Sequence, residues 1–232
     1  MRTAAPLPFV FVNMAMTADG KIASADRRLT TFGSPLDAQH LYQLRATADA
    51  ILCGARTIEQ SHSTLGNGPE RFTEARLHAG RQKFPLRVVV SGSGSISTGA
   101  ELWSRPYGPV IVATTRRASA ARLRWFRTQS AAVYQATTNE LDWSHFLPWL
   151  RVNYGVERIL SEGGGELNDG LFRARLVSEL HLTWCPLLLG GRRGSTIADG
   201  RGSPDLAAAV GFNLIRARRV GDEFFLTYRF LG

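Results

Sequence analysis

The chain has 232 residues, of which 44% are hydrophobic and 20% charged, so it can bury a full core without disulfides or metal. Basic residues outnumber acidic ones by 28 to 19, giving a net charge of +9, and all but Lys21 and Lys83 are arginine. This composition excludes global disorder and coiled coil and favours anionic ligands, and we expect a single domain over residues 1–232.

Neither cysteine indicates a disulfide or a metal ligand. Cys53 and Cys185 each lie inside an apolar run, where a free cysteine behaves as a small hydrophobe. No apolar stretch approaches the ~20 residues of a membrane span. Pro6, Pro8 and Asn13 interrupt the N-terminal segment, unlike the core of a signal peptide. These features predict a cytoplasmic protein with no membrane association.

The first part of the chain alternates strand and helix patterns. Residues 9–16 form a β-branched and aromatic run that ends in a Thr-Ala-Asp-Gly turn, typical of a buried strand. Ser34 followed by Pro35 marks a helix start, and apolar residues keep helical spacing to about residue 48. Residues 49–53 predict a second strand. Residues 61–80 lack a clear period and predict a long loop with at most a short helix, of the kind that often holds substrate.

The alternation continues toward the C-terminus. Further strands are predicted at 86–91, 109–114, 131–135 and 157–161, and helices at 118–129, from Asp142 to about 154, and from the glycines at 163–165 onward. Such alternation implies crossover connections and a mostly parallel sheet covered on both faces. Residues 178–188 and 213–230 are typical of long strands, with Gly221-Asp222 as a turn, so we expect an antiparallel closing hairpin.

Residues that follow strands are candidate binding residues, because ligands of open α/β sheets bind at the carboxyl ends of the strands. Four such junctions carry glycines, hydroxyls or guanidinium groups: Gly54-Ala55-Arg56-Thr57, Ser91-Gly92-Ser93-Gly94, Thr114-Thr115-Arg116-Arg117 and Glu162-Gly163-Gly164-Gly165-Glu166-Leu167. The first and the last also open helices, whose free N–H groups attract phosphate. Each motif alone more often reflects turn geometry. Together they predict a nucleotide site.

Several segments resemble the reductases of riboflavin biosynthesis, which reduce the ribosylamino side chain of a diaminopyrimidinone 5′-phosphate. The segments are VNMAMTADGKIA (12–23), LRATADAILCGARTI (44–58), LRVVVS (86–91), ILSEGGGELNDGLF (159–172) and VSELHLTWCPLLLGG (177–191). The resemblance implies a dihydrofolate-reductase-like fold, a three-layer α/β/α arrangement with a mostly parallel mixed sheet and a C-terminal antiparallel hairpin. It also implies a homodimer, with 178–188 and 213–230 as candidate interface.

The resemblance assigns roles to particular residues. It implies NADPH binding by Gly54, Arg56, Thr57, Ser91, Gly92, Gly163, Gly164, Gly165, Glu166 and Leu167. Thr115 and Arg116 join this set because they follow a strand, where such ligands bind. Asn13, Asp19 and Glu162 would form the catalytic, substrate-facing side, with hydride passing to C1′ of the ring-opened imine. Arg56, Arg116 or Arg117 would select the 2′-phosphate of NADPH.

Physical chemistry leaves alternatives for the three residues on the substrate side. Glu162 lies beside a helix start, which stabilises its carboxylate form. It could accept hydrogen bonds from ribityl hydroxyls or favour the iminium cation, or it could be an ordinary loop residue. Asp19-Gly20 is equally a common turn pair. Asn13 lies in an apolar strand, where a buried amide needs partners and could be structural.

Two departures from the family leave the substrate open. Members usually carry Asp-Asp-Pro-x-Leu-Thr where this chain has QSHSTLGNG (60–68), and a first-helix arginine used for the substrate phosphate is missing near Leu36 and Ala38. Asp37 lies in an S-P-L-D-A stretch that resembles the pteridine-binding carboxylate of dihydrofolate reductases. The alternative is therefore a related NADPH reductase acting on a pterin-like or other heterocycle. The direction of Asp37, into the cofactor cleft or out to solvent, discriminates the two.

Two other functions are not indicated. The zinc-deaminase pattern, H-x-E with a later P-C-x-x-C, is absent and the five histidines show no metal spacing, so we expect no metal site and no deaminase activity. The sequence pI is about 10.5, yet the arginines are scattered along the chain, so we expect no nucleic-acid binding. The expected partner is a phosphorylated small molecule.

Overall fold

The structure is a computed structural model that describes residues 6–26, 32–129 and 132–231. Its contacts divide the chain into two compact units. Unit 1 comprises Met1–Phe9 and Arg45–Leu160, and unit 2 comprises Val10–Leu44 and Ser161–Gly232. A single domain over the whole chain stays a prediction. No helix among the described residues has both the length and the apolar character that crossing a membrane requires.

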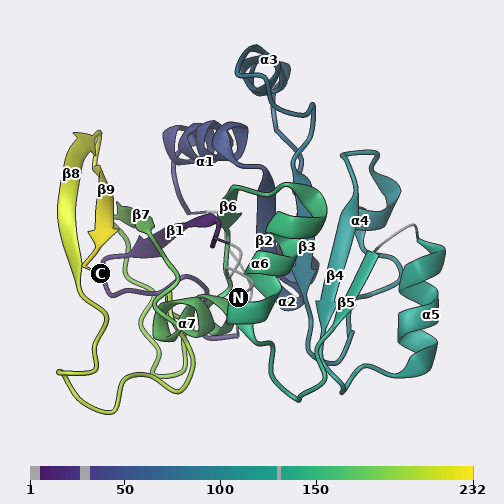
Figure 1. Ribbon diagram of the computed structural model, residues 1–232. Helices are drawn as coiled ribbons and strands as arrows, with labels where there is room; N and C mark the ends of the chain where they lie inside the picture. The colour runs from purple at the N-terminus through teal and green to yellow at the C-terminus, as the bar shows by residue number, and fades with distance from the viewer. Residues whose placement is uncertain (1–5, 27–31, 130–131, 232) are drawn as a thin grey trace. The chain divides into compact units, whose positions relative to one another are not determined.

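Unit 1 contains strands in the order β5-β4-β3-β2-β6 (Figure 1). The strands are β2 (Ala50–Gly54), β3 (Leu86–Val90), β4 (Val110–Thr114), β5 (Ala132–Gln135) and β6 (Arg158–Ser161). The helices are α2 (Ala55–Ser61), α3 (Glu70–His78), α4 (Glu101–Ser104), α5 (Ala120–Thr128) and α6 (Trp143–Tyr154). The pairs β2–β3, β3–β4 and β4–β5 are parallel. Almost every residue of β2, β3 and β4 is buried, as expected of strands covered on both faces.

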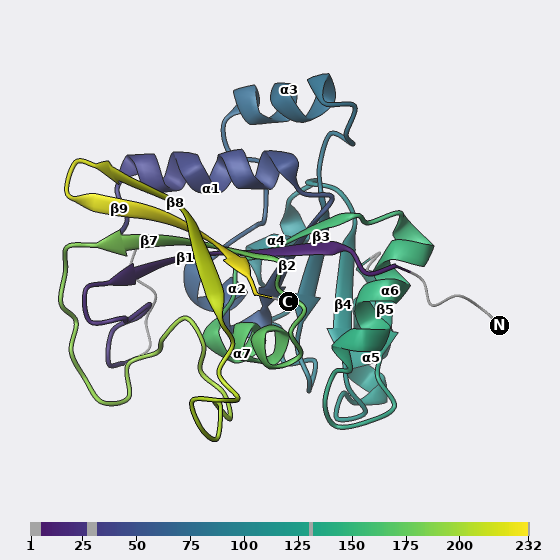
Figure 2. The same cartoon turned by 60° about the vertical axis from the view of Figure 1, so that its left-hand side comes forward.

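Unit 2 contains strands in the order β1-β7-β9-β8 (Figure 2). Its elements are β1 (Phe9–Thr17), α1 (Pro35–Thr47), α7 (Gly165–Arg173), β7 (Glu179–Cys185), β8 (Phe212–Val220) and β9 (Glu223–Phe230). β1 is parallel to β7, whereas β9 is antiparallel to both β7 and β8. The mixed α/β class, with mostly parallel strands and a C-terminal antiparallel hairpin, is therefore confirmed, and Gly221, at φ +60°, lies in the turn of that hairpin.

Three elements of the structure differ from the sequence prediction. β7 ends at Cys185 rather than at residue 188, because Pro186 follows and cannot donate a ladder hydrogen bond. α3 occupies nine residues of the predicted long loop. Its signal is electrostatic rather than periodic, since an acidic residue opens it and basic residues close it. The short helix α4 was not predicted.

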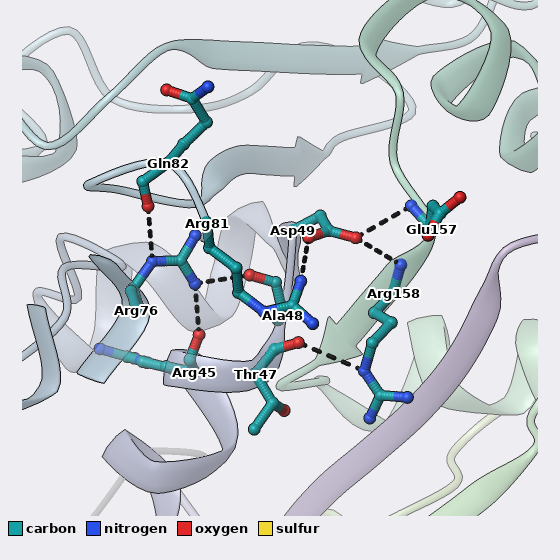
Figure 3. Close-up of polar contacts among 9 residues, drawn as sticks. All are labelled: Arg45, Thr47, Ala48, Asp49, Arg76, Arg81, Gln82, Glu157 and Arg158. Atoms are coloured by element: carbon teal, nitrogen blue, oxygen red, sulfur yellow. Dashed lines mark hydrogen bonds and ion pairs between the residues drawn. The ribbon is translucent and has the colours of Figure 1, made fainter. Parts of the chain in front are cut away.

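Buried arginines bind backbone carbonyls in unit 1 (Figure 3). The Arg76 side chain is fully buried, and its Nη1 donates to the carbonyls of Arg45 (2.8 Å) and Ala48 (2.6 Å) while Nε donates to that of Gln82 (3.0 Å). Burial lowers the pKa of Arg76 to about 10, so the side chain stays protonated at neutral pH. Arg87 acts similarly and binds the carbonyls of Leu102 and Gly108. Part of the arginine excess is therefore structural.

Replacing Arg76 by Met should destabilise the protein by about 2–4 kcal/mol, because three carbonyls lose their donor while the aliphatic packing is kept. Urea unfolding measures the change. Arg71→Gln, at an exposed position of the same helix, is the matched control and should cost less than about 0.5 kcal/mol. Equal losses in the two variants would contradict the carbonyl-binding role of Arg76.

Candidate functional site

The junctions after β2, β3 and β4 lie at one edge of unit 1. In the parallel register Gly54 pairs with Val90, and Val90 pairs with Ala113, so the chain leaves all three strands at the same level. Gly54 has extended backbone angles and directly precedes α2, where the sequence predicts a helix start. Arg56 is exposed and Thr57 half-buried on the first turn of that helix.

The β3 and β4 junctions are tied to each other. The Thr115 hydroxyl donates to the Gly92 carbonyl at 2.7 Å, and the Thr115 amide donates to the same oxygen at 3.1 Å. The Ser91 hydroxyl accepts the Ser95 amide at 3.0 Å and so closes the loop after β3. This edge therefore presents hydroxyl groups and backbone in a fixed arrangement.

Of the two adjacent arginines after β4, only Arg117 reaches this loop. A Cβ atom at position 92 would collide with the Arg117 guanidinium, so the glycine allows the cation to lie against the backbone. Arg117 Nε also lies 3.4 Å from the Thr115 hydroxyl. Arg116 instead donates from Nε to Asn139 Oδ1 at 2.8 Å, in the segment after β5. The guanidinium at the β3–β4 junction is thus that of Arg117.

In unit 2 the glycine-rich segment is shaped by close packing. Gly163 has φ +77°, a conformation that favours glycine, and a Cβ there would lie 3.0 Å from Met14 Sδ. A Cβ on Gly165 would lie 2.5 Å from the Thr196 carbonyl oxygen. The peptide bond between Gly163 and Gly164 is cis, and α7 begins at Gly165 with no side-chain cap on its N-terminus.

Three residues of the same segment differ in exposure. Glu162 is half-buried, Glu166 is exposed and Leu167 is buried. The dipole of the nine-residue helix α7 places partial positive charge at this segment, which suits an anionic ligand or the Glu162 carboxylate.

One face of the unit 2 strands holds buried polar atoms without a hydrogen-bond partner in the described part of the chain. They are Asn13 Oδ1 on β1, Thr183 Oγ1 on β7 and Asp37 Oδ1 on α1. Asn13 pairs in register with His181, and Thr183 follows two residues later on the same face of β7. A buried polar atom without a partner costs about 1–3 kcal/mol. These atoms therefore favour a ligand with N–H or O–H donors.

Asp37 does not point to solvent. Burial raises the pKa of the Asp37 carboxyl, and the nearby Glu223 carboxylate raises this pKa further. The Thr183 hydroxyl lies close to the carboxyl without completing a hydrogen bond, and it lowers the pKa in part. Glu223 in turn accepts the Ser34 amide at 2.8 Å and the Ser34 hydroxyl at 2.5 Å. Neither Thr183 nor Glu223 was predicted from the sequence. Thr183 lies inside an apolar strand, and Glu223 meets Ser34 only across 189 residues of chain.

Asp19 holds a loop. Its carboxylate accepts the Thr17 hydroxyl (2.6 Å) and the amides of Leu189 (3.2 Å) and Gly190 (2.7 Å). The Thr17 hydrogen bond is the main cause that lowers the pKa of Asp19 to about 2. The alternative role raised for Asp19-Gly20, a turn, matches this geometry, since the Gly20 amide donates to the Thr17 carbonyl at 2.9 Å. Among the described residues, no three His, Cys, Asp or Glu side chains gather as a metal site.

The comparison with known families decides the relationship. The model of the RibD C-terminal domain matches residues 8–226. This chain belongs to that family. It is 31% identical to the 2,5-diamino-6-ribosylamino-4(3H)-pyrimidinone 5′-phosphate reductase of Methanothermobacter thermautotrophicus, a match that covers 97% of this chain and 99% of the relative. The reductase of the same name from Archaeoglobus fulgidus is 30% identical, with 96% and 98% covered. The resemblance seen in the sequence is confirmed.

Solved structures show the same fold. A pyrimidine reductase-like protein from Corynebacterium diphtheriae has a TM-score of 0.82 at 20% identity, covering 97% of this chain and 92% of that one. RibD of Acinetobacter baumannii has a TM-score of 0.77 at 18% identity, covering 97% of this chain and 58% of that one. The fold of unit 1 and unit 2 is thus that of riboflavin-biosynthesis reductases.

Replacing Thr17 by Val should raise the pKa of Asp19 from about 2 toward 3.8, because the strongest hydrogen bond to the carboxylate is lost. NMR titration of the Asp19 carboxyl carbon measures it. A carboxyl whose pKa is lowered by folding adds stability above its unfolded pKa and loses it as pH falls through the folded value. The difference in free energy of unfolding between the parent and the variant should therefore become smaller as the pH falls from about 4 to about 2.

Thr196→Val is the control, because Thr196 binds Asp199 and should leave the pKa of Asp19 unchanged. A parent Asp19 that titrates near 3.8 would contradict the geometry.

Proposed function

We propose that this protein reduces the ribosylamino side chain of a diaminopyrimidinone 5′-phosphate to the ribitylamino form, in the cytoplasm, with NADPH as hydride donor. The observation that carries the proposal is the near full-length match to two reductases named for that substrate, at 31% and 30% identity. The edge residues of unit 1 and the polar face of unit 2 support it by their chemistry.

The donor set at the edge of unit 1 fits a phosphate-bearing dinucleotide. Gly54, Arg56, Thr57, Ser91, Gly92, Thr115 and Arg116 are the residues we assign to the cofactor there. Arg117 adds a guanidinium that already lies against the Gly92 backbone, and a planar guanidinium pairs with phosphate oxygens in two-point fashion. We therefore assign selection of the 2′-phosphate to Arg117 rather than to Arg116, which is bound to Asn139.

In unit 2 we assign Gly163, Gly164, Gly165, Glu166 and Leu167 to cofactor binding, with α7 contributing its positive end. When bound, the reduced nicotinamide supplies the hydride, so the protein contributes orientation and electrostatics. Glu162 is the residue we assign to the reacting sugar. Its carboxylate would accept hydrogen bonds from the sugar hydroxyls and stabilise the positive charge of the imine as hydride arrives. Asn13 offers its unpartnered Oδ1 to the substrate, and Asp19 fixes the loop at residues 189–190.

A second candidate function is a related reductase for a pterin-like heterocycle. It is favoured by the burial of Asp37, whose carboxyl faces Thr183 and Glu223 rather than solvent. A diaminopyrimidinone and a pterin both carry an amino group beside a ring nitrogen, so a carboxyl at this place suits either ring. Only the substrate assay separates the two.

We also propose a homodimer formed through the C-terminal strands. β8 is the last strand in its run, and Leu214 and Ile215 on it are 53% and 46% exposed. Apolar residues on an edge strand are usually covered, because an exposed strand edge pairs readily with another chain. Light scattering of the purified protein measures the mass, and a monomer at micromolar concentration would contradict this part of the proposal.

The function is tested by following NADPH oxidation with the diaminopyrimidinone ribosylamino phosphate, with dihydrofolate run in parallel. We expect turnover with the pyrimidinone and none with dihydrofolate. Turnover with dihydrofolate alone would replace the proposal by the second candidate, and the absence of turnover with both would overturn both.

Replacing Glu162 by Gln should lower kcat by about 100-fold or more, because the carboxylate charge at the reacting centre is lost. The dissociation constant of NADPH, from fluorescence titration, should change little. Glu157→Gln is the control, an exposed carboxylate just before β6 where Glu162 comes just after it. An unaltered kcat would remove Glu162 from the mechanism.

Replacing Arg117 by Leu should weaken NADPH binding about tenfold, ~1.4 kcal/mol, and leave NADH binding unchanged. Arg116→Leu, one residue away and with its guanidinium bound to Asn139, should weaken NADPH and NADH binding equally and by less than about threefold. The reverse pattern would assign the 2′-phosphate to Arg116, and equal affinity of the parent for NADPH and NADH would refute any arginine selection.

A further inference from the structure

A pocket of about 180 Å³ lies in unit 2 between α1 and the hairpin of β8 and β9, the region seen in Figure 2. It is lined by His40 and Gln43 from α1, Arg216 and Arg218 from β8, and Phe225 and Thr227 from β9. The sheet register explains the lining. Arg216 pairs with Thr227 and Arg218 pairs with Phe225, and side chains two residues apart on a strand point to the same face.

The pocket is positively charged and lacks a counter-ion. None of its lining residues is acidic, and within the described ranges neither Arg216 nor Arg218 makes an ion pair. Arg218 instead lies over the Phe225 ring, 5.3 Å from its centroid. Neighbouring arginines behave differently: Arg219, next along the strand, lies 3.5 Å from Asp222, and Arg229 lies 2.8 Å from Glu179.

The surroundings of His40 show the same imbalance. Burial is the first cause that lowers the pKa of His40 to about 4, and His181, Arg218 and Arg216 lower it further, while a hydrogen bond to Gln43 opposes them. The rings of His40 and His181 are 5.8 Å apart between centroids. Three carboxyl groups lie on this side of the sheet. Glu179 on β7 lies 3.5 Å from His181 Nε2 and is also paired with Arg229, whereas Asp37 on α1 and Glu223 on β9 lie close to each other.

We propose that this pocket binds a phosphate group, either as inorganic phosphate or as part of a phosphate monoester. Two guanidinium groups and the Gln43 amide offer more donors than the two oxygens of a carboxylate can use, whereas a tetrahedral phosphate has the oxygens to accept them. The Thr227 hydroxyl, 3.5 Å from His181 Nδ1, lines the same pocket. The volume of about 180 Å³ leaves room beside the phosphate for a small organic group.

The pocket shares no lining residue with the set assigned to the reductase reaction, and it lies on the same face of the unit 2 strands as Asn13 and Thr183. Thr227 pairs with His181 and Phe225 pairs with Thr183, whereas β7 ends at Cys185. At about 3.3 Å per residue, the Thr227–His181 pair lies ~13 Å and the Phe225–Thr183 pair ~7 Å before the carboxyl end of β7. The inference does not depend on the proposed function.

The test is an NMR titration of the His40 ring with inorganic phosphate at constant ionic strength. We expect a saturable response in which the pKa of His40 rises from about 4 toward its ordinary 6.5, because a bound anion cancels the repulsion from both arginines. The Arg216→Gln/Arg218→Gln double variant should lose the response. Arg219→Gln, on the same strand and already paired, should keep it.

Further arms separate the sources of the signal. Comparing the responses to ribose 5′-phosphate and to ribose tests whether the pocket binds a phosphate monoester. Titration with acetate tests whether any small anion gives the same response. A response equal for acetate and phosphate, equal in both variants, or absent in the parent overturns the proposal. Light scattering of the parent and the double variant covers the remaining alternative. A change of mass without a phosphate response would show that a second copy of the chain fills the pocket, and would also overturn the proposal.

Discussion

Parallel pairing is the constraint on which the candidate site depends. Strands that run in the same direction must be joined by crossovers, so their carboxyl ends meet at one edge and the segments that follow them become neighbours. In unit 1 this brings Gly54, Ser91 and Thr115 to the same level although they are far apart in the chain. The hydroxyls, glycines and the Arg117 guanidinium gather there as a consequence of topology.

Arginine serves two purposes in this protein. Arg76 and Arg87 are buried and satisfy carbonyls where chain segments turn, a task for which the five donors of a guanidinium are suited. Arg117, Arg216 and Arg218 instead lie exposed at the surface. The difference lies in what surrounds each side chain: carbonyl oxygens supply the partners in the interior, whereas an external anion can supply them at the surface.

The sequence predicts the strands of unit 1 well, because each is a short apolar run bounded by turn residues. It also predicts the closing hairpin, from two long strand patterns around Gly221-Asp222. It allows a short helix within residues 61–80 but does not place α3, because that segment has no clear apolar period. It also does not reveal that Asp37 lies beside Glu223, because these two residues meet only after folding. The residue types of Asp19 and Asn13 mark them as candidates, but the sequence does not decide their roles. Hydrogen-bond geometry is needed to choose between a turn, a structural amide and a ligand contact.

The central proposal is that the segments after β2, β3 and β4 in unit 1 bind a pyridine dinucleotide. Hydrogen exchange measured with and without saturating NADP⁺ tests it directly, because bound ligand slows exchange of the amides it covers. We predict slower exchange in residues 54–57, 91–95 and 115–117 when the ligand is bound. Unchanged exchange in those residues would contradict the proposal.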